Sequence, residues 1–125
     1  MQSSYMIKLY GINNCNTVKK ARLWLTHHHI NFEFIDFKKL PPQKEDIQFW
    51  LKNIPREILI NRKGTTWRKL SENEQSKVLL SDEEAITVML SYPSIIKRPI
   101  LIFEQNVIIG FDENQYQTLF TTSIN

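Results

Sequence analysis

Residues 5–37 read YMIKLYGINNCNTVKKARLWLTHHHINFEFIDF, and three consecutive patterns lie within them. Residues 5–10 alternate partly between apolar and polar types and end at Gly11, which is typical of a β-strand. Residues 15–28 carry apolar side chains at helical spacing, which predicts a helix. Residues 32–37 are aromatic and partly alternating, which predicts a second strand. A strand, a helix and a strand in so short a stretch form a βαβ unit, with parallel strands and a right-handed crossover.

The next part of the chain changes to a helical pattern, and residues 43–92 are predicted to be mostly helical. Apolar residues recur at i, i+3, i+4 and i+7 over residues 47–54, and Pro55 ends this helix. Residues 71–74 and 81–84 each fit the S-x-x-E capping box, in which a serine and a glutamate satisfy backbone N–H groups at the start of a helix. The helix after the second box is expected to bury Ala85, Val88, Met89 and Tyr92.

Strand patterns return within residues 98–120. Residues 100–103 and 107–109 are apolar segments on either side of three turn-forming residues, which predicts a β-hairpin. An N-terminal cap and a last amphipathic helix follow. This order of elements predicts an α/β (α+β) protein with a thioredoxin-like fold. Its four-stranded mixed sheet would lie in a single domain, residues 1–125, with a helical subdomain inserted at about residues 41–93.

The composition excludes several classes of protein. Of the 125 residues, 42% are hydrophobic, which is enough to bury a core without disulfides or metal ions. The formal net charge of +3 is too small to indicate a nucleic-acid or membrane partner. With a single cysteine, the chain can form neither an intrachain disulfide nor a Cys₂His₂ or Cys₄ zinc site. No apolar run is long enough to span a bilayer and no signal-peptide pattern is present, so we expect a cytoplasmic protein.

The run His27-His28-His29 has the composition of a metal-binding tract. Successive positions on a helix diverge by about 100°, however, so three adjacent imidazoles cannot converge on one ion. No metal site is therefore predicted.

Cys15 lies where the first strand ends and the helix begins, and the helix is expected to start at Asn14 or Cys15. There its sulfur would lie among unpaired backbone N–H groups at the positive end of the helix dipole, an environment that stabilises a thiolate. Lys19, four residues later on the same helical face, can add a positive charge. The alternative is that Cys15 is a small buried apolar side chain, which is a common role of free cysteine. Its position at the strand-to-helix turn favours the reactive role.

Three blocks of the sequence resemble the arsenate reductase-like (ArsC/Spx/YffB) family, and its YffB subgroup most closely. Residues 9–21, LYGINNCNTVKKA, resemble the family's cysteine turn. Residues 62–70, RKGTTWRKL, resemble the subgroup's RGTTWRKL segment, and residues 95–100, IIKRPI, resemble its IIKRP segment. The similarity covers roughly residues 6–120 in the family's order. It implies a thioredoxin-like fold with a helical insertion, in agreement with the predicted elements.

The resemblance also implies roles for particular residues. Cys15 matches the family's nucleophilic cysteine, and Arg98 matches an arginine that faces the thiolate in arsenate reductases. A fixed guanidinium offers planar donors to an oxyanion, a glutathione carboxylate or the thiolate itself. Pro99 is then expected to follow a cis peptide bond. A further arginine of the family falls near Arg62, although Arg68 lies in the subgroup's own motif, and we favour Arg62.

Two departures from the family's pattern narrow the expected chemistry. Arsenate reductases carry another arginine at about the position of Gly110, which argues against arsenate as the substrate. Spx regulators usually have a Cys-x-x-Cys pair, whereas Val18 stands at the second position here. Without an internal resolving thiol, a disulfide adduct on Cys15 must be released by an external thiol.

The leading hypothesis is a glutathione-dependent thiol/disulfide reductase that acts on a disulfide or an oxidised small molecule. Cys15 and Arg98 would be catalytic, glutathione would be a co-substrate, and no cofactor or metal would be bound. The residues expected to bind the thiolate or glutathione are Asn14, Asn16, Thr17, Lys19, Arg62 and Pro99. The alternative is a non-enzymatic Spx-like regulator that binds RNA polymerase through exposed residues of the helical insertion. Neither hypothesis involves a membrane or direct contact with nucleic acid.

Overall fold

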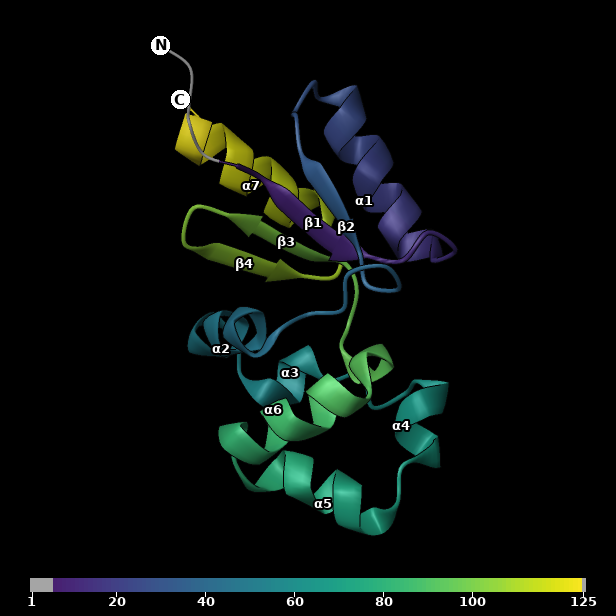
Figure 1. The fold of residues 1–125 in the computed structure, drawn as a ribbon. Helices are drawn as coiled ribbons and strands as arrows, with labels where there is room; N and C mark the ends of the chain where they lie inside the picture. The colour runs from purple at the N-terminus through teal and green to yellow at the C-terminus, as the bar shows by residue number, and fades with distance from the viewer. Residues whose placement is uncertain (1–5, 125) are drawn as a thin grey trace. The chain divides into compact units, whose positions relative to one another are not determined.

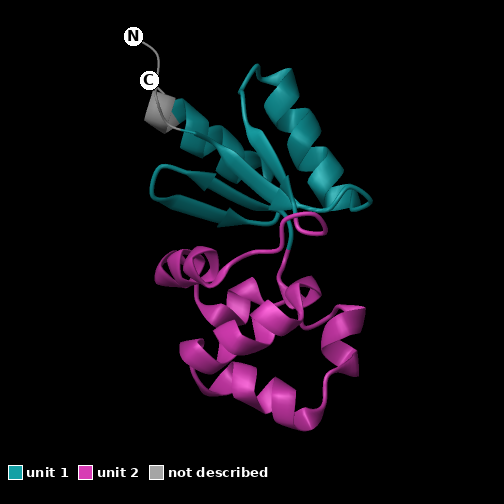
Figure 2. Ribbon diagram, viewed as in Figure 1, with its two compact units in different colours: residues 1–36, 98–125 teal, residues 37–97 magenta. Residues whose placement is uncertain are grey.

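The computed structural model describes residues 6–124 of the chain, including the side chains of residues 6–121. The described residues fall into two units, which Figure 2 shows in different colours. Unit 1 contains the residues up to Asp36 and those from Arg98 onward, and unit 2 is Phe37–Lys97. The predicted insertion, about residues 41–93, falls within unit 2.

Unit 1 is built on one sheet and two helices. Its elements are β1 (Lys8–Gly11), α1 (Asn16–His27), β2 (Glu33–Asp36), β3 (Ile100–Phe103), β4 (Asn106–Ile109) and α7 (Glu113–Ile124). The sheet has the strand order β2-β1-β3-β4 (Figure 1). β1 is parallel to β2, as the βαβ pattern predicts, and antiparallel to β3, which forms a hairpin with β4. The predicted four-stranded mixed sheet of a thioredoxin-like fold is confirmed.

One apolar core joins α1 and α7 to the sheet. Its buried members are Ile7, Leu9, Ala21, Trp24, Leu25, Leu101, Phe103, Tyr116 and Phe120. The rings of Trp24 and Tyr116 meet edge to face with their centroids 5.5 Å apart, a favourable geometry for aromatic pairs. Each large apolar side chain that is buried contributes about 1.5–3 kcal/mol. This core therefore fixes α1, and with it the turn that precedes α1, on the sheet.

The ends of the strands differ from the sequence prediction. β1 begins at Lys8 rather than at Tyr5, and Tyr5 lies outside the described residues. Lys8 is the residue at which pairing with both neighbours begins, because it lies opposite Glu33 of β2 and Ile102 of β3. A strand extends as far as its neighbours bond to it, which residue preference alone does not reveal.

Unit 2 consists of short helices. They are α2 (Lys44–Asn53), α3 (Arg56–Leu59), α4 (Thr65–Lys69), α5 (Glu72–Leu80), α6 (Asp82–Ser91) and the 3-10 helix η1 (Pro93–Ile95). The helix predicted over residues 47–54 is α2, which ends before Pro55 and buries Ile47 and Trp50. α3 and α4 were not predicted individually, because helices of this length contain too few residues to show a period.

A β-bridge ties two distant parts of unit 2 together. Ile60 and Ile96 form an isolated antiparallel bridge. On either side of it, backbone hydrogen bonds of 2.7 and 2.8 Å join residues 59–61 to residues 95–97. The segment that ends α3 is therefore held against the segment that leads to Arg98.

Both S-x-x-E boxes start a helix, as predicted. The Ser71 hydroxyl accepts the Glu74 N–H at 3.1 Å, and the Glu74 carboxylate accepts the Ser71 N–H at 3.2 Å. The Ser81 hydroxyl accepts the Glu84 N–H at 3.1 Å. These bonds satisfy N–H groups that have no acceptor within the helix, which is why α5 and α6 begin at these residues.

The prediction that Tyr92 is buried is wrong, since this side chain is 37% exposed. The other three side chains expected inside, Ala85, Val88 and Met89, are buried. α6 ends at Ser91, and the backbone of Tyr92 (φ −134°, ψ 72°) has left the helical conformation, so the helical period no longer applies to it. The Tyr92 hydroxyl instead hydrogen-bonds to Glu74. The Ser71 N–H and this hydroxyl together hold the pKa of Glu74 below its usual value.

Candidate active site

Cys15 is the N-cap residue of α1 and the last residue of the turn that follows β1. Figure 1 shows this turn between β1 and α1. This turn, residues 12–15, is called the cysteine turn below. The backbone of Cys15 is extended (φ −119°, ψ 123°), and its carbonyl oxygen accepts the Lys19 N–H at 3.0 Å. The N–H groups of the first helical turn have no acceptor within a helix and gather at this end. Since Cys15 is half-buried, it is partly accessible while it adjoins the positive end of α1.

The charge distribution around this end of α1 is unusual for the chain. The first turn of α1 carries no acidic residue, whereas the first turns of the other described helices of nine residues or more, α2, α5, α6 and α7, each carry at least one. The five-residue helix α4 also carries none. Carboxylates at a helix N-terminus are stabilising because they offset the positive end of the dipole. The polar residues predicted to surround the sulfur are all exposed: Asn14, Asn16, Thr17 and Lys19. The first turn of α1 therefore presents its positive end, without a carboxylate of its own, at the single cysteine of the chain.

A close approach between β1 and α1 fixes both ends of the cysteine turn. A Cβ atom on Gly11 would lie 2.8 Å from Cγ2 of Val18, which is too close without a shift. Glycine at this position therefore lets the helix pack tightly against the strand. Val18 is fully buried. The position at which a Cys-x-x-Cys pair has its second thiol is thus filled by an aliphatic core side chain.

The pairing of β1 with β3 brings Arg98 and Pro99 to the end of the sheet at which the cysteine turn lies. Tyr10, near the end of β1, pairs with Ile100, the first residue of β3. Because the strands are antiparallel, the residues after one lie beside the residues before the other. The Arg98–Pro99 peptide bond is cis, as expected, and Arg98 is half-buried.

Gly110 also adjoins this end of the sheet. Its φ angle of +80° is in the left-handed region, which favours glycine. Its N–H donates to the carbonyl oxygen of Pro99 at 2.8 Å. By the resemblance, arsenate reductases carry an arginine at about this position. Here the position is occupied by glycine, which has no side chain.

Arg62 and Arg68 belong to unit 2, and both are exposed. The Cζ atom of Arg62 lies 5.8 Å from the centroid of the Trp67 ring, within the range of a cation–π interaction. Arg68 lies on α4. The role of either arginine toward Cys15 stays a prediction.

One set of contacts at the cysteine turn was missed by sequence reasoning. Nη1 of Arg22, on α1, donates to Oδ1 of Asn13 at 3.1 Å. Nδ2 of Asn13 donates to Oδ2 of Asp36, the last residue of β2, at 3.4 Å. The Arg22 guanidinium also lies over the ring of Phe34, with 4.2 Å between Cζ and the ring centroid. These residues come from three segments of the chain, so no local pattern could have indicated them.

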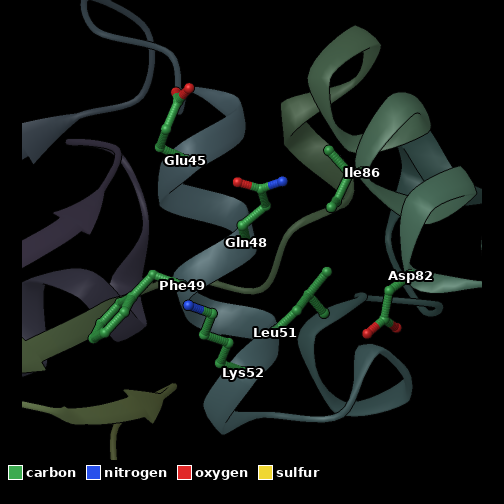
Figure 3. Close-up of a pocket in the computed structure, with 7 residues that line it drawn as sticks. All are labelled: Glu45, Gln48, Phe49, Leu51, Lys52, Asp82 and Ile86. Carbon is green, nitrogen blue, oxygen red and sulfur yellow. The ribbon is translucent and has the colours of Figure 1, made fainter.

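A hollow of about 540 Å³ lies in unit 2 (Figure 3). It is lined by Glu45, Gln48, Phe49, Leu51, Lys52, Asp82 and Ile86. Asp82 is ion-paired with Arg56 at 2.7 Å. Its lining includes neither a thiol nor an imidazole, so it does not provide the nucleophile that the sequence predicts.

Within residues 6–124, no three or more His, Cys, Asp or Glu side chains gather in a way that could hold a metal ion. His28 stacks on the ring of Trp24 with 3.9 Å between centroids, and its Nδ1 lies 2.8 Å from the Trp24 carbonyl oxygen. Of the helices that the structure describes, none combines the length and the apolar character needed to cross a membrane.

Several known proteins are similar to this chain. The model of the ArsC family matches residues 10–119. The solved structure of a YFFB protein is 37% identical, with a TM-score of 0.85, over 90% of this chain and 97% of its own. An arsenate reductase (ArsC) related protein from Brucella melitensis is 41% identical, with a TM-score of 0.71, over 96% and 98% of the two chains. The global transcriptional regulator Spx 1 of Bacillus cereus is 25% identical over 95% of this chain and 90% of its own.

Proposed function

Because this chain belongs to the ArsC family, we propose that it is a thiol/disulfide reductase in which Cys15 is the nucleophile and glutathione is the external thiol. The observation that carries this proposal is the position of Cys15, the half-buried N-cap of a helix without a carboxylate in its first turn. A helix N-terminus favours negative charge, and the thiolate is the nucleophilic form of cysteine. The geometry therefore supports a reactive thiolate at Cys15.

In the first step, the Cys15 thiolate attacks one sulfur of a disulfide or of a mixed disulfide with glutathione. A new S–S bond forms at Cys15 while the substrate's S–S bond breaks. The other sulfur leaves as a thiolate, which takes a proton from solvent. At this point the disulfide has moved from the substrate to the protein.

In the second step, a glutathione thiolate attacks the mixed disulfide on Cys15. The Cys15 thiolate leaves and is regenerated, and glutathione departs in a new disulfide. When the substrate is a glutathione adduct, the products are one substrate thiol and oxidised glutathione, so electrons balance. An external thiol is needed because the core side chain of Val18 stands where an internal resolving thiol would be.

The residues of the cysteine turn and the first turns of α1 have proposed roles around the sulfur. Asn14, Asn16 and Thr17 are exposed and would donate hydrogen bonds to the thiolate or to the incoming disulfide. Lys19, also exposed, would favour the thiolate and attract the carboxylates of glutathione. These interactions stabilise the Cys15 thiolate before the first step, and they strengthen again in the second step, when negative charge develops on the departing Cys15 sulfur.

The segment before β3 has a second proposed role. Arg98 would donate a planar pair of hydrogen bonds to a glutathione carboxylate or to the thiolate, and Pro99 would form part of the same surface. Arg62 belongs to unit 2, and its role toward the bound anion stays a prediction from the resemblance. Gly110 cannot supply the additional guanidinium of arsenate reductases, which favours a disulfide over arsenate as the substrate.

The test compares the parent with Cys15→Ser, which replaces the sulfur with an oxygen of similar size. Each protein is incubated with glutathione and a small glutathione mixed disulfide, and the oxidised glutathione formed is measured. We expect turnover by the parent, background rates for the variant and equal thermal midpoints. Intact mass spectrometry should detect one glutathione on the parent. Equal turnover by Cys15→Ser would contradict the nucleophile, and release of the substrate thiol with cysteine but not with glutathione would contradict the choice of thiol.

The second candidate function is a non-enzymatic regulator that binds RNA polymerase. The similarity to Spx 1 over 95% of this chain favours it. Under this alternative, exposed side chains of unit 2, such as Leu79 and Leu80 on α5, contact the polymerase. Purified RNA polymerase should then be captured by the parent and by the control Leu23→Ser, which changes an exposed residue of unit 1, but not by Leu79→Ser/Leu80→Ser. A parent that fails to retain purified polymerase contradicts this candidate.

A further inference from the structure

We infer that Asn13 is a positioning residue that holds the cysteine turn between α1 and β2, an inference that rests on the proposed function of Cys15. Asn13 lies two residues before Cys15, and its amide bonds in two directions. Oδ1 accepts from Arg22 of α1 at 3.1 Å, and Nδ2 donates to Asp36 of β2 at 3.4 Å. One side chain of the cysteine turn is thereby joined to the helix that follows the turn and to the neighbouring strand.

The chemistry of the two partners determines which way the amide of Asn13 faces. A guanidinium has only donors and a carboxylate has only acceptors. An asparagine between them must therefore direct its oxygen toward Arg22 and its nitrogen toward Asp36. Alanine would remove both bonds, and aspartate would oppose the Asp36 carboxylate with a like charge.

The partners of Asn13 are themselves held by the fold. Arg22 lies over the ring of Phe34, 4.2 Å from the centroid, and Phe34 belongs to β2. Asp36 ends β2 and lies opposite Gly11, the last residue of β1, in the parallel register. The contacts therefore form a closed path from β1 through the cysteine turn to α1 and back through β2.

The expected effect is on Cys15 rather than on the stability of unit 1. Both hydrogen bonds of Asn13 are exposed to solvent, where polar contacts contribute little to folding. Released from them, the cysteine turn would hold Cys15 less closely at the N-terminus of α1. Alkylation of Cys15 near neutral pH would then be slower, while its rate in strong alkali, where any thiol is ionised, would be unchanged.

The experiment measures the rate of Cys15 alkylation by iodoacetamide at about pH 7 and at about pH 10, on either side of the ordinary thiol titration. It compares the parent with Asn13→Ala and with Asn106→Ala, a control that removes an exposed asparagine bonded to the Phe103 carbonyl in the same unit. We expect Asn13→Ala to lower the ratio of the two rates by roughly tenfold, with an unchanged thermal midpoint. Asn106→Ala should keep the parent's ratio.

A charge exchange gives a second, independent readout. Asn13→Asp should slow alkylation near neutral pH in the parent but not in an Asp36→Asn background. In the double variant the amide at position 36 can donate to the carboxylate at position 13, and the net charge equals the parent's. An unchanged ratio in Asn13→Ala, or an equal effect of Asn13→Asp in both backgrounds, overturns the positioning role while leaving Cys15 as the nucleophile. If Cys15 of the parent is alkylated only when the protein unfolds, the proposed function is overturned, and this inference with it.

Discussion

The two cations of unit 1 that are proposed to act on the Cys15 sulfur differ in their surroundings. Lys19 is exposed on α1, where water and salt weaken its interactions. Arg98 is half-buried just before β3, and its guanidinium has a planar arrangement of donors. Charge-assisted hydrogen bonds gain strength where water is partly excluded. Arg98 should therefore contribute more than Lys19 to the reactivity of the thiolate.

Replacement of Arg98 by alanine is expected to slow the reaction of Cys15 with oxidised glutathione roughly tenfold or more, the equivalent of one charge-assisted hydrogen bond. Arg98→Lys should recover part of the rate, because it keeps the charge but not the planar pair of donors. The rate constant for formation of the mixed disulfide, followed by intact mass spectrometry, measures the effect. Lys77→Ala, which removes an exposed cation of α5, is the control. Equal rates for the two alanine variants would exclude Arg98 from the site.

Among the secondary-structure elements, the contact between β1 and α1 determines where the cysteine turn begins and ends. Gly11 ends β1, and Val18 lies in the first turns of α1 with its side chain fully buried. The approach of the two is so close that an added methyl group would lie 2.8 Å from Val18. The start of α1, and therefore the N-cap residue Cys15, is positioned by packing as well as by hydrogen bonds.

The substitution Gly11→Ala is expected to lower the free energy of unfolding by about 1–3 kcal/mol, because overpacking forces α1 away from β1. In a Val18→Ala background the same substitution should cost less, since space for the methyl group is then present, and the two effects should not add. Urea unfolding followed by circular dichroism measures both. Gly110→Ala is a useful comparison, because its added Cβ meets no atom within 4 Å and its cost arises from φ alone. Additive costs for the Gly11 and Val18 variants would contradict this account.

For the molecule as a whole, the core of unit 1 combines large aromatic rings with two buried polar atoms. Nε1 of Trp24 and the hydroxyl of Tyr116 have no hydrogen-bond partner among the described residues. Burial raises the pKa of Tyr116, because the phenolate is disfavoured in an apolar core. This group therefore contributes stability below the pKa of an unfolded tyrosine, and the contribution is lost as the pH rises above that value.

The variant Tyr116→Phe is expected to keep the parent's stability at neutral pH or to gain about 1 kcal/mol, since it removes a buried hydroxyl without a partner. Above about pH 10 the parent should lose stability more steeply than the variant, because unfolded tyrosine ionises there while folded Tyr116 does not. Urea unfolding at a series of alkaline pH values measures the difference. A less stable variant at neutral pH would indicate that the hydroxyl is hydrogen-bonded, for example to a buried water.

Local patterns in the amino-acid sequence were sufficient to predict most elements of unit 1 and the position of its thiol. Alternation predicted the strands, the helical period predicted α1, and the Ser71 and Ser81 motifs identified where α5 and α6 begin. Each of these features depends on residues within one or two turns of chain, so the sequence contains them directly. The placement of Cys15 at the N-cap of α1 follows from the same local information, and the family resemblance added Arg98 and the cis bond before Pro99.

Contacts between distant residues were decided by the folded chain. Asn13 bonds to Asp36, 23 residues away, and no periodicity links the two. Tyr92 continues the helical spacing of α6, yet its backbone leaves the helix and its side chain turns to Glu74 instead of the core. Such pairs depend on how completed elements pack against one another, and packing is set by the shapes of all the side chains in the core together. The thiol is therefore identifiable from the sequence, whereas the contacts that hold its turn in place emerge only when the strands and helices are assembled.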